Sequence, residues 1–436
     1  MSLPELQAQI SAVSEDIERQ KEVLRRLELN KSLLQRQVND ILDPIARLPV
    51  EISSKIFVEC LHPFLYTPPP TGIRSMPTIL LQVCHAWTDI ALSTTSLWTK
   101  IHIVLPASRG FPAVLQGWLE RARDQPLHLH ITIRFGRNEA FDDGVSAVLQ
   151  RRSGQLQCID IHLAEHASMS HVPFESTQTD PMPHLQTLRI KSHNNSVCDP
   201  STLLQLLHRA PNLVELSLDF LHIRDATVDE IGAIVLPRLR RLYVARIVAG
   251  EGGEIFQFIT APGIEYLALK FVSTLSNDLL SFLKRSSPPL QNLAVDCAEC
   301  PEPEFLDELL SLVPTLIRLD IGFPDPDLIE RLFTILARTH PSRALPILQT
   351  IEFQSSAGDE ISDASWDHLL PVLVARRNEI RALRVFVLPT YHHDGQPIVA
   401  TLDQFAPPRV LPALKELAAG GMEFWMGPYE ENLFSA

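Results

Sequence analysis

The feature that most restricts the fold of this chain is a short apolar pattern that recurs from residue 156 toward the C-terminal region. Each copy places apolar residues at its first, fourth and sixth positions, and most copies follow a proline. The copies begin at Leu156, Leu185, Leu213, Leu239, Ile264, Leu290, Leu316, Leu348, Ile380 and Leu414. Between Pro211 and Pro314 the prolines lie 25 or 26 residues apart, and later copies are more than 30 residues apart. Because so short a unit cannot bury its own apolar face, the repetition predicts stacked units.

Helical patterns separate the copies. They run from Pro200 to Leu207, from Leu279 to Leu283, from Phe305 to Leu312 and from Leu328 to Leu336, and Thr227 to Glu230 has the spacing of a helix-capping box. One strand and one helix per unit resembles leucine-rich repeats, in a divergent form. The turn position that usually carries Asn holds His193, Leu221, Ile247, Val272 and Ala298. The resemblance implies an α/β solenoid with an inner parallel sheet over residues 154–421, with loose curvature, and a C-terminal cap at 422–436.

Residues between the apolar positions of each copy are expected on the solvent face of the sheet, because successive side chains of a strand alternate. These residues are Arg189, Lys191, Glu215, Asp219, Arg241, Tyr243, Tyr266, Lys270, Asn292, Asp296, Arg318 and Asp320. Charges of both signs with two aromatic residues are typical of a surface that binds another protein. The alternative is that they are only the polar face that any such sheet turns to solvent.

Residues 3–41 follow a seven-residue rhythm without an interrupting glycine. With Leu3 at heptad position a, the a residues are Leu3, Ile10, Ile17, Leu24, Lys31 and Val38, and the d residues are Leu6, Val13, Gln20, Leu27, Leu34 and Ile41. Ten of these twelve residues are apolar. Such a stripe predicts a coiled-coil helix over residues 1–41, either as a parallel homodimer or packed back on its own chain.

A second helical pattern occupies residues 42–100. Pro49 and Glu51 suit the first turn of a helix that continues through Ile52 and Ile56. The Pro-rich segment from His62 to Pro77 interrupts it. A further helical face then runs from Leu80 to Ala91, and Leu97 and Trp98 end the pattern.

Three ordered motifs in this region, Leu-Pro-x-Glu-Ile-x-x-x-Ile-Phe, Val-Cys-x-x-Trp and Leu-Trp, resemble an F-box, in the expanded form common in mushroom-forming fungi. The resemblance implies an all-α module that docks on the Skp1 adaptor of a cullin-RING ubiquitin ligase. It places a set of nine residues at the adaptor-facing surface or in the small fold behind it. These are Leu48, Pro49, Ile52, Ile56, Phe57, Val83, Cys84, Trp87 and Trp98. The alternative is a generic amphipathic helical linker.

Residues 101–153 are expected to be a joint that caps the N-terminal edge of the array. Within them, apolar and polar residues alternate from Leu127 to Ile133, which predicts a strand with one solvent-exposed face. The fold class expected for the whole chain is therefore α+β: a coiled-coil helix and an all-α module, followed by an α/β solenoid.

The composition restricts the classes of partner and the cellular compartment expected for this chain. A formal charge of −14 opposes nucleic-acid binding, which requires clustered Lys and Arg. Six cysteines in 436 residues do not form a disulfide framework. We expect neither a secretory leader nor a membrane span, and hence a protein of the cytoplasm or nucleus.

Three short motifs contain residue types that can carry metal or redox chemistry. His162-x-x-Glu165-His166 has an inverted zinc-protease spacing, but His162 is expected to end a strand rather than lie on a helix. Cys297 and Cys300 form a lone Cys-x-x-Cys without a second pair, and His392-His393-Asp394 is expected in a loop. We therefore expect no metal, no cofactor and no enzymatic activity.

Two functions fit these patterns. The first is a substrate receptor, in which the F-box-like module holds Skp1 and the repeats bind a target protein. The second is a homo-oligomeric scaffold that assembles through residues 3–41 and works without the ligase.

Overall fold

The computed structural model describes most of the chain. The described residues are 3–45, 47–61, 77–108, 110–134, 143–164, 167, 172, 174, 180–192, 197–198, 200–219, 222–223, 233–246, 255–272, 277–297, 303–322, 326–338, 344–356, 361, 363–388, 402, 405–428 and 432–434. The chain divides into two compact units. Unit 1 comprises Met1–Lys100 and Ala113–Gln125, and unit 2 comprises Ile101–Pro112 and Pro126–Ala436.

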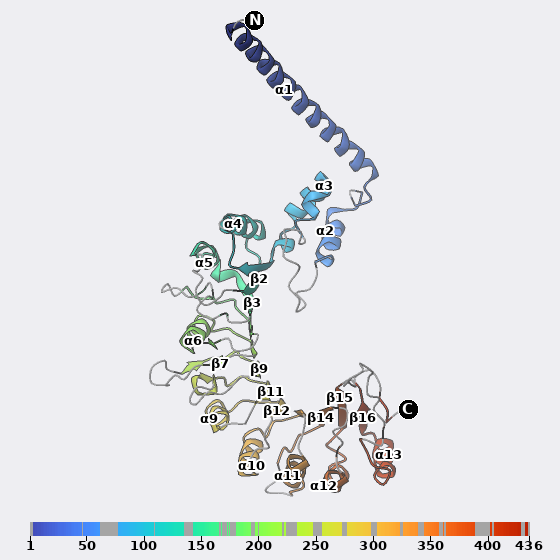
Figure 1. Ribbon diagram of the computed structural model, residues 1–436. Helices are drawn as coiled ribbons and strands as arrows, with labels where there is room; N and C mark the ends of the chain where they lie inside the picture. Colours follow the sequence, from blue (N-terminus) through green and yellow to red (C-terminus); the bar gives the residue numbers. More distant parts are fainter. Residues whose placement is uncertain are drawn as a thin grey trace. The chain divides into compact units, whose positions relative to one another are not determined.

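Unit 1 is helical. Its elements are α1 (Leu3–Leu42), α2 (Val50–Glu59), the 3-10 turns η1 (Leu80–Gln82) and η2 (Thr95–Trp98), α3 (His85–Ser93) and most of α4 (Phe111–Ala122). The long N-terminal helix expected from the heptad pattern is confirmed as a 40-residue helix (Figure 1). Pro49 occupies the N-cap position of α2, which begins at the next residue as its sequence predicted.

The segment from Leu80 to Ala91 differs from the single helical face that its apolar spacing indicated. It consists of the η1 turn, an extended Cys84 with φ −159° and ψ 174°, and then α3 from His85. Val83 is 51% exposed and so lies off the buried face. Val83 and Cys84 both have low helix propensity, so the helical segment is easily interrupted at these two residues.

Unit 2 is built on a twelve-stranded sheet, so the chain as a whole is mixed α/β. The strands are β1 (Lys100–Leu105), β2 (Leu127–Ile133), β3 (Leu156–Leu163), β4 (Thr187–Ser192), β6 (Glu215–Asp219), β9 (Arg241–Ala245), β11 (Tyr266–Val272), β12 (Asn292–Cys297), β13 (Arg318–Gly322), β14 (Thr350–Ser356), β15 (Ala382–Leu388) and β16 (Glu423–Gly427). They lie side by side in chain order. Every register described from β2 to β16 is parallel.

Helices lie in most of the described connections between successive strands of the main sheet, and in Figure 1 those of unit 2 line the outer side of its curved sheet. They are α5 (Asp143–Gln150), α6 (Pro200–His208), α8 (Ile255–Phe258), α9 (Asn277–Ser286), α10 (Pro303–Leu312), α11 (Pro326–Leu336), α12 (Asp363–Ala375) and α13 (Leu411–Ala419), with the 3-10 turn η3 (Ser153–Gln155). Two short parallel pairs, β5 (Val197–Cys198) with β7 (His222–Ile223) and β8 (Ile234–Val235) with β10 (Ile259–Thr260), lie apart from the main sheet. The helices expected at 200–207, 279–283, 305–312 and 328–336 are confirmed, and Thr227–Glu230 falls outside the described residues.

The two ends of the sheet come from regions that carry no clear repeat. Residues 101–153, expected as a joint, supply β1 and β2 at one edge, and residues 422–436, expected as a cap, supply β16 at the other. The last apolar copy, by contrast, is not a strand, because Leu414 and Leu417 lie in α13. Its alanines, Lys415 and Glu416 are strong helix formers, and Pro412 suits a first helical turn.

The core of unit 2 consists of the repeated apolar residues. In every copy from Leu156 to Ile380 the first, fourth and sixth residues are buried, as Leu213, Leu216 and Leu218 illustrate at 0% exposure. Each buried leucine contributes about 1.5–3 kcal/mol relative to an exposed one. Because every second side chain of a strand enters this core, the residues between them form the opposite, polar face.

Candidate functional site

The helical module of unit 1 closes around aromatic side chains. Phe57 of α2 is 1% exposed and Trp98 of η2 is 0% exposed. The ring centroids of Phe57 and Trp87 are 4.9 Å apart, and Nε1 of Trp98 donates a 2.8 Å hydrogen bond to the Ala91 carbonyl. Two of the nine motif residues are therefore core residues and not surface residues.

Residues of α4 enclose Trp98 from the other side. The indole of Trp118 packs edge-on against Trp98 at 5.0 Å, and its Nε1 donates to the Trp98 carbonyl at 3.0 Å. The guanidinium of Arg121 lies 4.7 Å from the centre of the Trp98 ring. The sequence offered no signal for this contact, since α4 follows a strand that belongs to unit 2.

Asp43 joins the end of α1 to this module. Its Oδ2 accepts a 2.6 Å hydrogen bond from Nε1 of Trp87, and Sγ of Cys84 lies 3.6 Å from the same oxygen. Its Oδ1 accepts the backbone N–H of Ile45 at 2.9 Å. Reasoning from the sequence missed Asp43, although an Asp between a helix end and Pro44 is a common turn residue.

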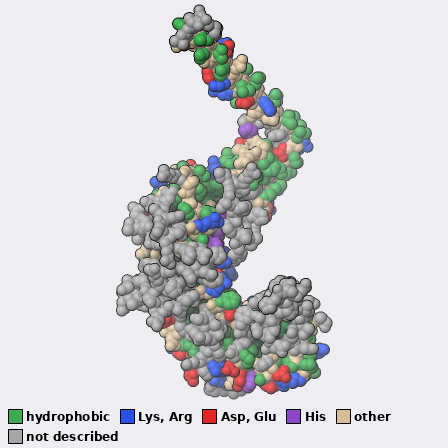
Figure 2. Space-filling model, viewed as in Figure 1, with side chains coloured by type: hydrophobic (Ala, Val, Ile, Leu, Met, Phe, Trp, Pro, Cys, Tyr) green, Lys and Arg blue, Asp and Glu red, His purple; other side chains and the backbone are tan. Residues whose placement is uncertain are grey.

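The remaining apolar motif residues lie on the surface. Leu48, Ile52, Ile56 and Val83 are 37–51% exposed, and Figure 2 shows hydrophobic side chains over this part of unit 1. Pro49 is exposed, while Cys84 and Trp87 are half-buried. Val50 and Ile79 are also exposed, at 49% and 40%, and were missed because Val50 occupies an unspecified position of the first motif and Ile79 lies outside the motifs. We call Leu48, Val50, Ile52, Ile56, Ile79 and Val83 the exposed apolar set.

The second candidate surface is the polar face of the sheet. The register places Glu215, Arg241, Tyr266, Asn292 and Arg318 on adjacent strands, each opposite the next. A neighbouring row holds Arg189, Tyr243 and Asp320 in equivalent positions. The structure thus brings most of the expected target-binding residues together on one face.

Two of those expected residues are not available to a partner. Asp219 is 8% exposed and is held by Arg246, whose Nε donates to its Oδ1 at 2.9 Å. Asp296 is 4% exposed, and burial raises the pKa of its carboxyl group although Lys270 acts in the opposite direction. Alternation alone could not separate these residues from exposed ones, because their burial comes from residues near adjacent strands: Arg246 beside Asp219, and Gly322 beside Asp296.

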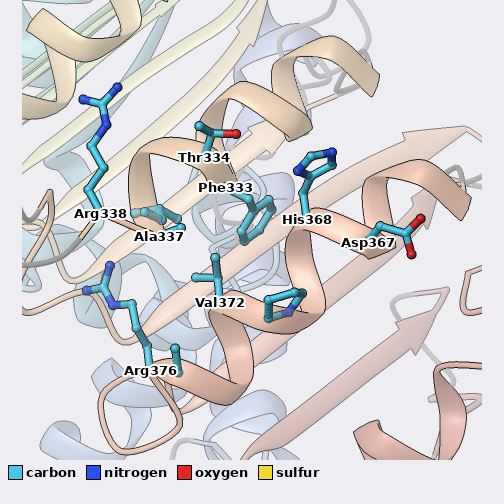
Figure 3. A pocket seen from close by; sticks show the side chains of 11 residues that line it. Phe333, Thr334, Ala337, Arg338, Asp367, His368, Val372 and Arg376 are labelled. Carbon is cyan, nitrogen blue, oxygen red and sulfur yellow. The ribbon is translucent and has the colours of Figure 1, made fainter.

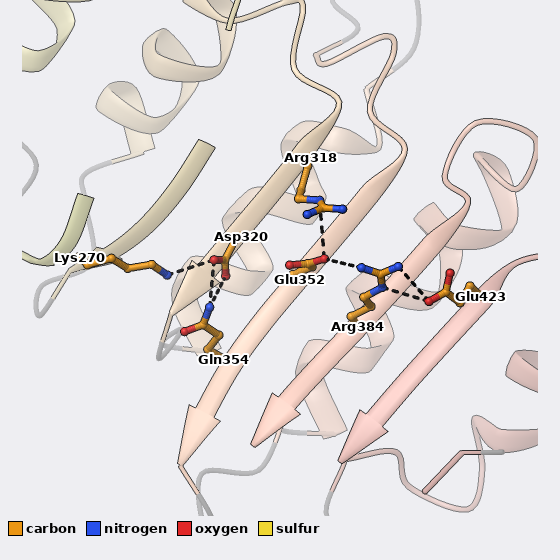
Figure 4. Close-up of polar contacts among 7 residues, drawn as sticks. All are labelled: Lys270, Arg318, Asp320, Glu352, Gln354, Arg384 and Glu423. Atoms are coloured by element: carbon orange, nitrogen blue, oxygen red, sulfur yellow. Dashed lines mark hydrogen bonds and ion pairs between the residues drawn. The ribbon is translucent and has the colours of Figure 1, made fainter. Parts of the chain in front are cut away.

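Ion pairs cross the C-terminal half of the polar face (Figure 4). Nζ of Lys270 lies 3.1 Å from Oδ2 of Asp320, which also accepts Nε2 of Gln354 at 3.0 Å. Arg384 bridges Glu352 and Glu423 at 3.0 Å each, and Arg318 lies 3.7 Å from Glu352. Lys191, another expected residue, lies in β4 outside these ion pairs, and the strand register places it between His162 of β3 and Asp219 of β6. Glu352, Arg384 and Glu423 were missed, although the same alternation applied to the last copies would have found the first two.

The centre of the face is less occupied by internal pairs. Arg241 and Tyr266 lie opposite each other, and neither makes an ion pair or side-chain hydrogen bond with another described residue. Tyr266 is 36% exposed, and burial of the rest of its ring raises the pKa of its phenol. These two side chains are therefore open to an external partner, whereas Arg189 is already held by Glu215 at 2.8 Å.

Histidines occupy the N-terminal end of the same face. The rings of His102 and His130 are 4.8 Å apart, and Nε2 of His102 lies 3.0 Å from Oγ1 of Thr132. Burial, followed by the charges of His130 and Arg134, lowers the pKa of His102 to about 4. Burial also raises the pKa of the nearby Cys158 thiol to about 11, so that thiol is not an activated nucleophile.

A cavity of about 560 Å³ lies between α11 and α12 (Figure 3). Its lining includes the apolar side chains of Phe333 and Val372 and the guanidinium-bearing residues Arg338 and Arg376. Arg338 is paired with Asp307 at 2.9 Å, and Arg376 with Glu379 at 3.0 Å. Both guanidinium groups are thus engaged within the chain.

The motifs weighed for metal chemistry are not assembled into a site in the described part of the chain. His162 lies in β3 as expected, but Glu165, His166, Cys300 and the loop of His392 fall outside it. Within the described ranges, no group of three or more His, Cys, Asp or Glu side chains is placed to hold a metal ion.

The chain was compared with known proteins. No family model matches it, and no curated protein matches it. Among the helices that the structure describes, none combines the length and the apolar character needed to span a membrane.

Proposed function

We propose that this protein is the substrate-recognition subunit of a Skp1–cullin–F-box type ubiquitin ligase. In this proposal residues 42–100 form an F-box that docks a Skp1-like adaptor. The twelve-stranded sheet and its helices form a divergent leucine-rich-repeat solenoid that binds a target protein. The chain itself catalyses no step, and it works in the cytoplasm or the nucleus.

The observation that carries the proposal is the division of the motif residues into core and surface. Phe57 and Trp98 are buried, while Leu48, Ile52 and Ile56 remain at least 37% exposed around them. A small monomeric module rarely exposes so many large apolar side chains unless a partner covers them. A helical protein partner fits such a surface, since apolar side chains on helices dock into hydrophobic grooves.

The polar face of the sheet supports the target-binding half of the proposal. Arg241 and Tyr266 are the kinds of residue that dominate protein–protein binding energy, and they lie side by side without internal partners in the described chain. Two clusters on the adjacent strands, Lys270–Asp320–Gln354 and Arg318–Glu352–Arg384–Glu423, pair opposite charges with one another.

The mechanism is proximity. Holding adaptor and target on one chain makes the encounter of the target with the ligase intramolecular, which raises its effective concentration. Ubiquitin transfer then depends on the other subunits of the ligase.

The test is binding of the purified full-length chain to a purified Skp1 adaptor. The double variant Leu48→Ala with Pro49→Ala should lose binding, while Val114→Ala, an equally apolar residue that is 63% exposed on α4, should bind as the parent does. A double variant that binds as tightly as the parent refutes the assigned surface.

The alternative function is a coiled-coil homo-oligomeric scaffold without ligase activity. The exposed heptad stripe of α1 favours it. A chain that forms oligomers but has no affinity for the Skp1 adaptor would support the scaffold and exclude the receptor.

A further inference from the structure

The long helix α1 carries an apolar stripe that nothing in the described chain covers. Every seam residue from Leu6 to Ile41 whose side chain is described and apolar is exposed, from 39% for Leu6 to 66% for Ile10 and Ile41. Such a stripe in a single helix is unfavourable in water. A 3.5-residue apolar period is covered best by a second helix of the same period, because only such a helix follows the stripe along its length.

The other faces of α1 are those of a solvent-exposed helix. Ion pairs Asp16–Arg19 at 2.7 Å and Glu18–Lys21 at 2.8 Å span neighbouring turns, with all four side chains at least 64% exposed. A third pair, between Glu22 and Arg25, continues the series. Outside the seam, α1 therefore carries mainly charged and uncharged polar residues, with a few apolar positions such as Leu29 and Leu33.

We propose that α1 pairs with α1 of a second copy of this chain, parallel and in register, as a two-stranded coiled coil. Charge complementarity supports this occupant. In a parallel pair each g residue faces the e residue five positions later in the partner, which places Asp16 against Lys21 of the second copy on both sides of the seam. The exposed pairs that these residues make within one helix are weak and exchange readily.

The polar seam residues also favour this register. In parallel, Gln20 faces Gln20 of the second copy, and two amides can hydrogen-bond each other. Lys31 faces Lys31, but its long side chain can extend past the seam to water. The antiparallel arrangement with maximal overlap sets Gln20 against Leu24 and Lys31 against Val13, each twice, and brings the two Lys21 residues together.

The consequence is a protein that presents two helical modules and two sheets. This inference does not depend on adaptor binding. A dimer without Skp1 affinity would refute the function proposed above and leave the paired helix in place. A monomeric chain that binds Skp1 would instead support the function proposed above and refute the paired helix.

The first experiment measures the mass of the full-length chain by light scattering across micromolar concentrations. The parent should show twice the 48.9 kDa of one chain. Leu27→Glu, at seam position d, should halve that mass, while Leu29→Glu should leave it unchanged because Leu29 points away from the seam. The two leucines are 59% and 64% exposed in the single chain, so an effect unrelated to pairing would be the same for both. A monomeric parent, or equal dissociation by both variants, overturns the proposal, as does a trimeric or tetrameric mass.

The second experiment tests orientation by oxidative cross-linking against the parent, whose own cysteines set the background. Ile10→Cys should form a disulfide-linked dimer, and Ala8→Cys, on the outer side of the same turn, should not. In the antiparallel pair the two copies of residue 10 would lie roughly 36 Å apart along the axis. If Ile10→Cys cross-links only when mixed with Leu34→Cys, the helices are antiparallel and the stated arrangement is wrong.

Discussion

Nε1 of Trp87 donates a 2.6 Å hydrogen bond to Oδ2 of Asp43, a residue 44 positions earlier in the chain. The same carboxylate caps the turn at Ile45 through its other oxygen. One side chain therefore links the end of α1, the turn before Leu48 and the start of α3. Two residues of the exposed apolar set lie next to this link: Val83 precedes Cys84, and the N–H of Leu48 donates to the Ile45 carbonyl at 3.1 Å.

Replacing Asp43 with Ala should lower the free energy of unfolding of unit 1 by about 1.5–3 kcal/mol, because a hydrogen bond to a charged acceptor is lost and the indole N–H is left without its partner. Urea unfolding followed by tryptophan fluorescence would measure the change. Glu22→Ala is the matched control, since Glu22 lies away from the seam and makes only an exposed ion pair with Arg25, so its loss should cost no more than about 0.5 kcal/mol. Equal effects of the two variants would contradict the structural role of Asp43.

Stability and adaptor binding should depend on different residues of the helical module. Phe57→Ala empties a buried site and should destabilise the unit by about 3–5 kcal/mol. Ile52→Ala, at a residue 48% exposed, should change stability by less than about 0.5 kcal/mol yet weaken adaptor binding. The two readouts are thermal unfolding and adaptor affinity. An Ile52 variant that binds normally would remove that residue from the docking surface.

Gly322 on β13 lies against the buried side chain of Asp296, and a Cβ atom at residue 322 would come within 2.8 Å of Cγ of Asp296. Gly322→Ala should therefore cost about 1–3 kcal/mol through overpacking. Gly154 has open space around its Cα, so Gly154→Ala in the same unit should be neutral or stabilise by up to about 1 kcal/mol. Denaturant midpoints of the two variants test the pair, and a harmless Gly322→Ala would show that the strands can shift apart.

The lowered pKa of His102 predicts how the free energy of unfolding depends on pH. Between its ordinary value of 6.5 and about 4, the unfolded chain takes up a proton at this residue that the folded chain does not. Stability should therefore fall as pH drops through that window, and His102→Gln should flatten the dependence by at most about 2 kcal/mol once solvent screening is allowed for. His130, Arg134, Asp160 and His162 face the ring and remain in the variant. The exposed His85→Gln is the control for removing an imidazole, and an unchanged slope for His102→Gln would contradict the assignment.

Periodic features were predictable. The heptad of residues 3–41 indicated α1, and the repeated apolar pattern located the main-sheet strands β3, β4, β6, β9 and β11 to β15 together with the buried side chains on them. These predictions succeed because a period of 3.5 or 2 residues repeated many times leaves few other ways to bury the apolar residues. The F-box and leucine-rich-repeat resemblances remain proposals, which the adaptor and target experiments address.

Features made by single residues were not predictable in the same way. Leu414 and Leu417 matched the strand pattern but lie in a helix, since local propensity outweighed a pattern of two leucines. Asp219 and Asp296 matched the exposed positions but are buried. Asp43 matched no motif, and only its contact with Trp87 reveals its role.

The sequence by itself determined that a long amphipathic helix, a small helical module and an ordered array of strands occur in this order, because each follows from a local period. The tertiary structure decided which motif residues are core and which are surface, which charges of the sheet are already paired, and that β1 and β16 close its two edges. Those outcomes depend on contacts between residues tens of positions apart, such as Trp98 with Trp118 or Lys270 with Asp320, whose free energy no local pattern records.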